Sequence, residues 1–134
     1  MEISNEELIK KAAEVAKLKK VSEDVRIGDV GCALVTDNGN IHLGVSIHAC
    51  CGIGFCGEHS AIASMVTNKE YKIKKIVATT GDGTILPPCG RCREMIYEIN
   101  EENLDTEIIV EKDKTVRLKE LLPRRWQETW DLES

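Results

Sequence analysis

Two short segments hold the residues whose types and spacing could do chemistry. One reads Cys-Gly-Glu at positions 56–58, and the other reads Pro-Cys-Gly-Arg-Cys at positions 88–92. Three cysteine thiolates can hold one zinc ion, and a zinc site with only three protein ligands keeps a water at its fourth position. A carboxylate two residues from the first cysteine can exchange protons with that water. The sequence therefore predicts an open zinc centre in which Cys56, Cys89 and Cys92 are ligands and Glu58 is the acid–base residue.

The two cysteine segments are expected to begin helices. Free backbone N–H groups at a helix N-terminus favour the thiolate, and the spacing of Cys89 and Cys92 places their sulfurs one turn apart on the same face. Three thiolates and Zn²⁺ leave an excess negative charge, which works against an activated water. Arg91 and His59 are candidate donors to the sulfurs that would offset this charge, although Arg91 also suits a plain surface position.

Hydrophobic periodicity predicts an alternation of strands and helices. A capping box at Ser4 and Glu7 starts a first helix that should run to about Lys20. Strands are expected at 32–35, 41–47, 73–80, 106–110 and 115–117, with helices from about 56 and from about 89 to 100. An Asn-Gly pair at 38–39 suits a tight hairpin. This order implies parallel pairings with helices packed on the sheet, and a single domain over residues 1–134.

Composition limits the classes of partner. The chain of 134 residues carries 18 basic and 23 acidic side chains, a net charge of −5 spread along the sequence. Because phosphate neutralisation supplies most of the affinity for nucleic acids, an acidic chain favours a small uncharged or cationic substrate instead. No apolar run approaches the roughly 20 residues that span a membrane, and the N-terminus does not resemble a signal peptide. We expect a cytoplasmic protein without membrane contact.

The remaining cysteines and histidines have ordinary interpretations. Without an export signal, disulfides are disfavoured, and Cys32 in an apolar strand is expected to be buried. Cys50 and Cys51 are adjacent and cannot easily chelate one ion. His42 alternates outward and is expected on the surface. His48 ends the second strand, where a substrate pocket or plain surface is equally compatible with it.

The cysteine and glutamate segments resemble those of the cytidine deaminase family, and most closely those of blasticidin-S deaminases. Weaker similarity extends to segments 22–24, 44–45, 83–93 and 120–123. The resemblance implies a three-layer α/β/α fold with a five-stranded mixed sheet, assembled as a homotetramer. It also implies hydrolytic release of ammonia from the 4-amino group of a cytosine ring. Glu58 would then pass a proton from the zinc-bound water to ring N3 and help to protonate the leaving amine.

Departures from the family pattern concern the substrate. Nucleoside-specific members hold the ribose hydroxyls with an Asn-x-Glu pair, and the matching positions here are Ser46 and His48. The aromatic residue that stacks on the base is replaced by Gly28. Trp126, just after a Leu-Pro turn, is a candidate to stack on the ligand of its own or an adjacent site, although packing on its own domain is equally compatible. The expected substrate is a free cytosine nucleoside or an analogue with a modified sugar.

Two other functions share the same motif. One is a zinc-binding structural module in which Glu58 is only a helix N-terminal carboxylate, and the missing fourth ligand counts against it. The other is a polynucleotide-editing deaminase, which would need a basic surface.

Overall fold

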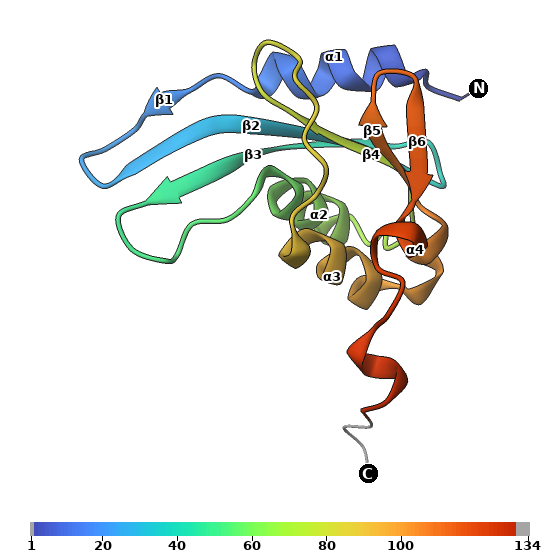
Figure 1. The fold of residues 1–134 in the computed structure, drawn as a ribbon. Coiled ribbons are helices and arrows are strands. Elements are labelled where there is room, and N and C mark those ends of the chain that lie inside the picture. Colours follow the sequence, from blue (N-terminus) through green and yellow to red (C-terminus); the bar gives the residue numbers. More distant parts are fainter. Residues whose placement is uncertain (1, 131–134) are drawn as a thin grey trace.

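A mixed sheet separates one helix from two others (Figure 1). The computed structural model describes residues 2–130. Its helices are α1 (Asn5–Val15), α2 (Gly57–Thr67), α3 (Gly90–Ile99) and α4 (Leu118–Leu121), with 3-10 turns η1 (Glu101–Asp105) and η2 (Trp126–Glu128). Its strands are β1 (Lys19–Lys20), β2 (Val25–Thr36), β3 (Ile41–Ala49), β4 (Ile73–Thr79), β5 (Glu107–Glu111) and β6 (Lys114–Arg117).

The long strand β2 organises the sheet. Strand β3 pairs with one edge of β2, and the remaining strands follow in the order β1-β2-β4-β5-β6. Within the described residues the pair β4–β5 is parallel, whereas the other pairs are antiparallel. The expected three-layer α/β/α fold is confirmed, with the two-residue β1 as a sixth strand beyond the five expected. The parallel pairing predicted from the strand–helix alternation holds only after α3, because β4 lies against the antiparallel strand β2.

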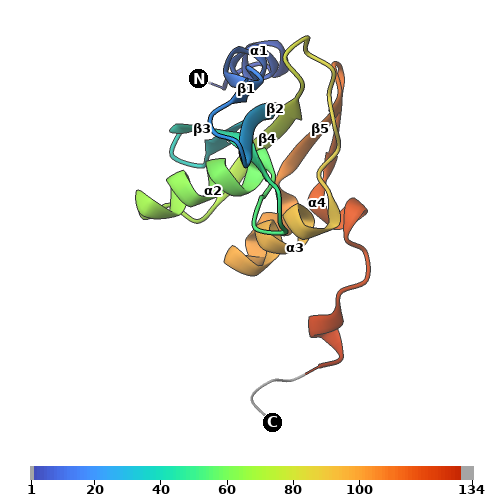
Figure 2. The ribbon, with the colours of Figure 1, turned by 90° about the vertical axis from the view of Figure 1, so that its left-hand side faces the viewer.

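Two apolar clusters fill the spaces between the layers. Alternate residues of β2 point to opposite faces, so Cys32 and Leu34 join the cluster beneath α2 and α3, while Ala33 joins the cluster beneath α1. Figure 2 shows α1 on one side of the sheet and α2 and α3 on the other. Cys32 is fully buried, as the sequence predicts. Both cysteine-bearing helices, α2 and α3, therefore pack on the same face of the sheet.

The first helix is shorter than its periodicity predicts. It ends at Val15 instead of about Lys20, and Lys19 and Lys20 pair with β2. The helix ends here because the backbone at Lys17 passes directly against Gly28 of β2. The contact is so close that a Cβ added at Gly28 would lie 2.0 Å from the carbonyl oxygen of Lys17. Gly28 also has a φ of 84°, a conformation that favours glycine.

His42 is buried, which corrects the prediction that it lies on the surface. Its side chain faces α2, and the residue is only 8% exposed. The imidazole Nδ1 lies 3.0 Å from Ser64 Oγ, and Nε2 lies 3.0 Å from Glu70 Oε1. Ile41 and Leu43 alternate with His42 along β3, and as apolar residues they were expected to face the core. In the structure both are exposed, and His42 is on the buried face. Apolar residues are common on protein surfaces, so on this edge strand their alternation does not identify the buried face.

The network around His42 predicts a pH-dependent stability. Hydrogen bonds from Thr36 and His42 hold the pKa of Glu70 at about 2, below its ordinary value of 4.5. Because the pKa of the folded state is the lower one, this stabilisation is complete above about pH 4.5 and is lost as the pH falls toward 2. We expect Glu70→Gln to lower the urea midpoint at neutral pH, and the deficit to shrink below about pH 4.5.

Urea titrations of both proteins at several pH values measure this deficit. Glu14→Gln is the matched control, since Glu14 is exposed and its carboxylate has no ion-pair or hydrogen-bond partner among residues 2–130. A deficit that stays constant with pH would contradict the assigned role of the Glu70 charge.

Candidate metal centre and active site

Two helix N-termini bring three cysteines together. Cys56 and Cys89 are the N-cap residues of α2 and α3, both with extended backbone conformations. The Sγ atoms of Cys56 and Cys89 lie 3.4 Å apart, and those of Cys89 and Cys92 lie 3.5 Å apart. All three ligand atoms lie within 4.8 Å of one another. The predicted ligands therefore form one cluster.

The spacing of the sulfurs fits zinc. Tetrahedral zinc with Zn–S bonds of about 2.3 Å places its sulfurs about 3.8 Å apart, close to the distances in this cluster. Within residues 2–130, Cys56, Cys89 and Cys92 are the one group of side chains arranged to hold a metal ion. The donor set therefore leaves a fourth position open, as a catalytic site does.

The protonation of the thiols depends on their surroundings. Burial raises the pKa of the Cys92 and Cys56 thiols, and the carboxylate of Glu58 adds to this effect. Burial also opposes ionisation of Cys89, but hydrogen bonds from the backbone N–H of Cys92, the neighbouring thiols and the N–H of Arg91 lower its pKa overall. The helix N-terminus therefore favours a thiolate at Cys89, as expected. The same expectation is wrong for Cys56, where burial outweighs the helix N-terminus, so the sulfurs of Cys56 and Cys92 need a cation to ionise.

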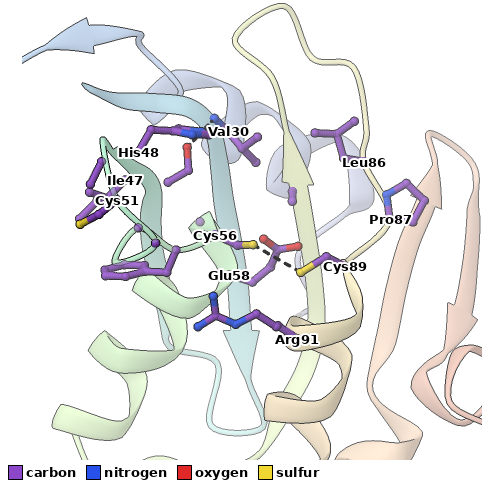
Figure 3. A pocket seen from close by; sticks show the side chains of 17 residues that line it. Val30, Ile47, His48, Cys51, Cys56, Glu58, Leu86, Pro87, Cys89 and Arg91 are labelled. Atoms are coloured by element: carbon purple, nitrogen blue, oxygen red, sulfur yellow. Dashed lines mark hydrogen bonds between the residues drawn. The ribbon is translucent and has the colours of Figure 1, made fainter. Parts of the chain in front are cut away.

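Glu58 lies beside the sulfurs. It is the second residue of α2, and only 5% of it is exposed. Figure 3 shows its carboxylate beside the sulfurs of Cys56 and Cys89, in the wall of a cavity. Burial raises the pKa of Glu58, against the opposing effects of hydrogen bonds from its own backbone N–H and from the Cys92 thiol. A carboxylate with a raised pKa can take and release a proton close to neutral pH.

The cavity has a volume of about 430 Å³, within the range of small-molecule sites. Its walls come from the middle of β2, the end of β3, the loop 51–55, the start of α2, the end of β4 and the segment that leads into α3. Apolar walls are formed by Val30, Ile47, Ala78 and Leu86, and polar groups by Ser46, His48, Glu58 and Arg91. Such a pocket suits a flat ring with a polar substituent.

The two predicted donors to the sulfurs occupy different positions. His59 Nδ1 lies 3.4 Å from Cys92 Sγ. Burial lowers the pKa of His59, and the charge of Arg91 lowers it further, so the ring is favoured in its neutral form. Arg91 is exposed on the wall of the cavity and has no hydrogen bond to a sulfur within the described residues. His59 thus lies close to the cysteine cluster. That Arg91 offsets the negative charge of the sulfurs stays a prediction.

Of the three candidate substrate contacts, two line the cavity and one does not. Ser46 and His48 line the cavity, and the buried Ser46 Oγ accepts a hydrogen bond from the backbone N–H of Val30 at 3.0 Å. Trp126 does not line the cavity of its own chain. Its Nε1–H donates to Glu94 Oε2 on α3 at 2.9 Å, and 46% of the residue is exposed.

Sequence reasoning missed one residue that holds the site. Arg93 Nε donates to the carbonyl oxygen of Pro88 at 2.8 Å, and its Nη1 donates to the carbonyl oxygen of Leu121 at 3.1 Å. These bonds tie the turn before α3 to the end of α4. The one feature of the sequence that could have indicated a role for Arg93 is its position immediately after Cys92. Cys51 also lines the cavity, while Cys50 lies outside it, and both are exposed.

No helix within residues 2–130 has both the length and the apolar character needed to cross a membrane.

Comparison with known proteins identifies the family. The chain is 27% identical to a cytidine deaminase of Mycobacterium tuberculosis over 95 residues, which cover 70% of this chain and 69% of that one. Its fold is similar to crystal structures of cytidine deaminases from M. tuberculosis (TM-score 0.76, 23% identity, 93% of this chain and 98% of that one) and Mycobacterium leprae (0.75, 25%, 92% and 100%). The family model for the cytidine and deoxycytidylate deaminase zinc-binding region matches residues 2–106. The chain belongs to this family of deaminases with a zinc-binding region.

Proposed function

We propose that this chain is a zinc-dependent hydrolytic deaminase that removes the 4-amino group of the cytosine ring in a free nucleoside or nucleoside analogue, with release of ammonia. One observation carries this proposal. The buried carboxylate of Glu58 and two of the three clustered cysteines, Cys56 and Cys89, line one cavity that is large enough for a nucleoside. The related M. tuberculosis protein is a cytidine deaminase, which supports the same reaction class.

Glu58 moves the protons of the reaction. When zinc is bound, it supplies an activated water at the position that the three sulfurs leave open. The Glu58 carboxylate would accept a proton from this water and deliver it to ring N3 as the water oxygen bonds to C4. Glu58 would then help to protonate the amine as the C4–N bond breaks. Burial raises the pKa of Glu58, which makes its carboxylate a better acceptor for the proton of the water. The neutral His59 near Cys92 reduces the electron density on that sulfur without adding charge.

The cavity walls orient the ring. Val30, Ile47 and Leu86 provide apolar surface that excludes water from the ring faces. Ser46 and His48, which both line the cavity, stand at the positions that hold the ribose in nucleoside-specific relatives, so a modified sugar would be accommodated on this side of the site. A blasticidin S-like nucleoside therefore belongs to the proposed substrate class together with cytidine and deoxycytidine.

A non-catalytic zinc module fits the site less well. A structural zinc centre closes with four protein ligands, and the cluster has three within the described residues. Burying Glu58 carries a desolvation cost that a structural role does not require. An assay of cytidine, deoxycytidine, cytosine and blasticidin S for ammonia release tests the proposed function, and inactivity toward all four by zinc-loaded protein would contradict it.

We also propose assembly as a homotetramer. The segment after α4 extends away from the rest of the molecule (Figures 1 and 2), and it carries the exposed side chains of Trp126 and Trp130, at 46% and 62%. Exposed aromatic residues on a projecting segment favour contact with a partner. Because Trp126 does not line its own cavity, its proposed stacking on the ligand would occur in the site of a neighbouring subunit.

Loss of one ligand should remove the metal. We expect the purified protein to hold about one zinc per chain, and Cys89→Ala to lose most of it and unfold at a lower temperature, since metal binding contributes to folding free energy. Plasma emission spectrometry and thermal denaturation measure the two effects. Cys50→Ala, at an exposed cysteine outside the cavity, is the control and should retain full zinc. A fully active, metal-free parent protein would contradict the zinc assignment.

Replacing Glu58 should separate metal binding from turnover. Glu58→Gln keeps the size of the side chain but cannot carry a proton, so we expect zinc to remain while kcat falls by at least about 10²-fold. Parallel zinc analysis and ammonia assays measure this. Glu111→Gln, at an exposed strand end, serves as the control for removal of a carboxylate. Parental turnover by Glu58→Gln would exclude the acid–base role.

Trp126 should affect substrate binding and leave the metal in place. If it stacks on the ligand of a neighbour, Trp126→Ala should raise KM by about threefold to tenfold, in keeping with the energy of an aromatic contact, without loss of zinc. Trp130→Ala is the matched control on the same segment. Light scattering should report a tetramer, and a monomer that keeps full activity without residues 124–134 would contradict both parts of the proposal.

A further inference from the structure

A second group of side chains with nucleophilic chemistry lies toward the far end of α2 from the cysteine cluster. Nδ1 of His42 lies 3.0 Å from Oγ of Ser64, and Nε2 lies 3.0 Å from Oε1 of Glu70. Ser64 is eight residues beyond Cys56, about 12 Å along the helix axis. A hydroxyl, an imidazole and a carboxylate joined in this order form the arrangement that activates a serine nucleophile.

The carboxylate fixes the position of the imidazole proton. Oε2 of Glu70 accepts hydrogen bonds from Oγ1 of Thr36 at 2.6 Å and from Nδ2 of Asn38 at 3.2 Å. The bonds from Thr36 and His42 hold the pKa of Glu70 at about 2, so at neutral pH this group is ionised and only accepts. The proton between Glu70 and His42 therefore belongs to Nε2. In the neutral ring Nδ1 is then an acceptor for the Ser64 hydroxyl.

A neighbouring serine of the same helix has no such base. Ser60 lies one turn before Ser64 and is also half-buried, but its Oγ donates to the carbonyl oxygen of Val45 at 2.8 Å. A backbone carbonyl accepts this hydrogen bond but does not take the proton. Ser60 therefore serves as an internal reference for the reactivity of Ser64.

A surface pocket of about 690 Å³ lies beside the imidazole. The turn between β2 and β3 and the end of α2 form its walls, which include His42, Asn68 and Lys69. Ser64 lies one turn before Asn68, whose Nδ2 donates to the Ser64 carbonyl oxygen at 2.9 Å. Because the half-buried Ser64 is also 3.0 Å from His42, its hydroxyl lies at the edge of this pocket.

Lys69 adds a positive charge to the pocket wall. Its ammonium group has no ion-pair or hydrogen-bond partner among residues 2–130. Its backbone has a φ of 62°, a conformation that favours glycine and that recurs at functional sites. An unpaired cation beside a nucleophile can stabilise the oxyanion of acyl transfer. The ionised Glu70 in the same wall disfavours an anionic electrophile such as a phosphate ester, so a neutral carboxylic ester is the matching class.

We propose that Ser64 is a second nucleophile of this chain, which His42 and Glu70 activate to take an acyl group from an activated carboxylic ester. The Ser64 oxygen bonds to the carbonyl carbon, its proton passes to Nδ1 of His42, and the C–O bond to the leaving alcohol breaks. The imidazolium then returns the proton to the leaving oxygen. This inference is independent of the proposed deamination. The competing interpretation is a hydrogen-bond network that only ties β3 to the end of α2.

Acetylation of the zinc-loaded protein by p-nitrophenyl acetate tests the proposal, with fragment-ion mass spectrometry to assign each acetyl group. We expect Ser64 to be acetylated at least about 10²-fold faster than Ser60, in keeping with what a positioned general base contributes. Equal rates at the two serines, or no acetyl group on Ser64, would overturn the proposal. This comparison is made within one protein, so it does not depend on the folding of a variant.

Variants separate activation from simple exposure. His42→Gln removes the base and should lower the acetylation rate of Ser64 by at least about 10²-fold. Glu70→Gln loses the charge that favours the imidazolium, and Lys69→Gln loses the cation, so each should lower the rate by about tenfold. Lys10→Gln, at an exposed position of α1 on the other side of the sheet, is the control and should leave it unchanged. A folded His42→Gln variant with the parental rate would show that the imidazole does not activate Ser64.

Discussion

The rest of the structure depends on holding three sulfur atoms within reach of one ion. Cys56 and Cys89 are 33 positions apart in the chain, yet their sulfurs lie 3.4 Å from each other. Three thiolates at this distance repel one another strongly, so the cluster persists only where the backbone forces it and a cation or protons neutralise it. The fold meets this requirement by starting two helices at the same point.

Close packing fixes each helix against the sheet. An added Cβ at Gly44 on β3 would lie 2.3 Å from the backbone nitrogen of Ala61, so α2 lies directly on the strand that leads to the cavity. Arg93 holds the start of α3. The fully buried Asn103 holds its end, since its amide accepts from the N–H of Ile73 and donates to the carbonyl oxygen of Ile96. With both ends of α3 fixed, Cys89 and Cys92 have little freedom to separate.

Local signals in the sequence predicted the cysteine cluster and the two helix starts. The cysteine spacing and the helix starts at 56 and 89 depend on neighbours within a few positions, and the structure confirms the cluster and both N-termini. Features that depend on distant packing were not predictable in this way. Arg93 donates to the carbonyl oxygen of Leu121, which is distant in the sequence, and the burial of His42 depends on which face of an edge strand meets α2. The first helix ended early because of the crossing at Gly28.

Zinc K-edge X-ray absorption of the purified protein tests the central claim most directly, because it counts the ligands of the ion. The account predicts three sulfurs at about 2.3 Å and one oxygen at about 2.0 Å. That oxygen should be replaceable by small ligands added to the solution, since the fourth position is open. A shell of four sulfurs, or three sulfurs with the outer-shell scattering of an imidazole from His59, would show a closed structural site and contradict the proposed hydrolytic centre.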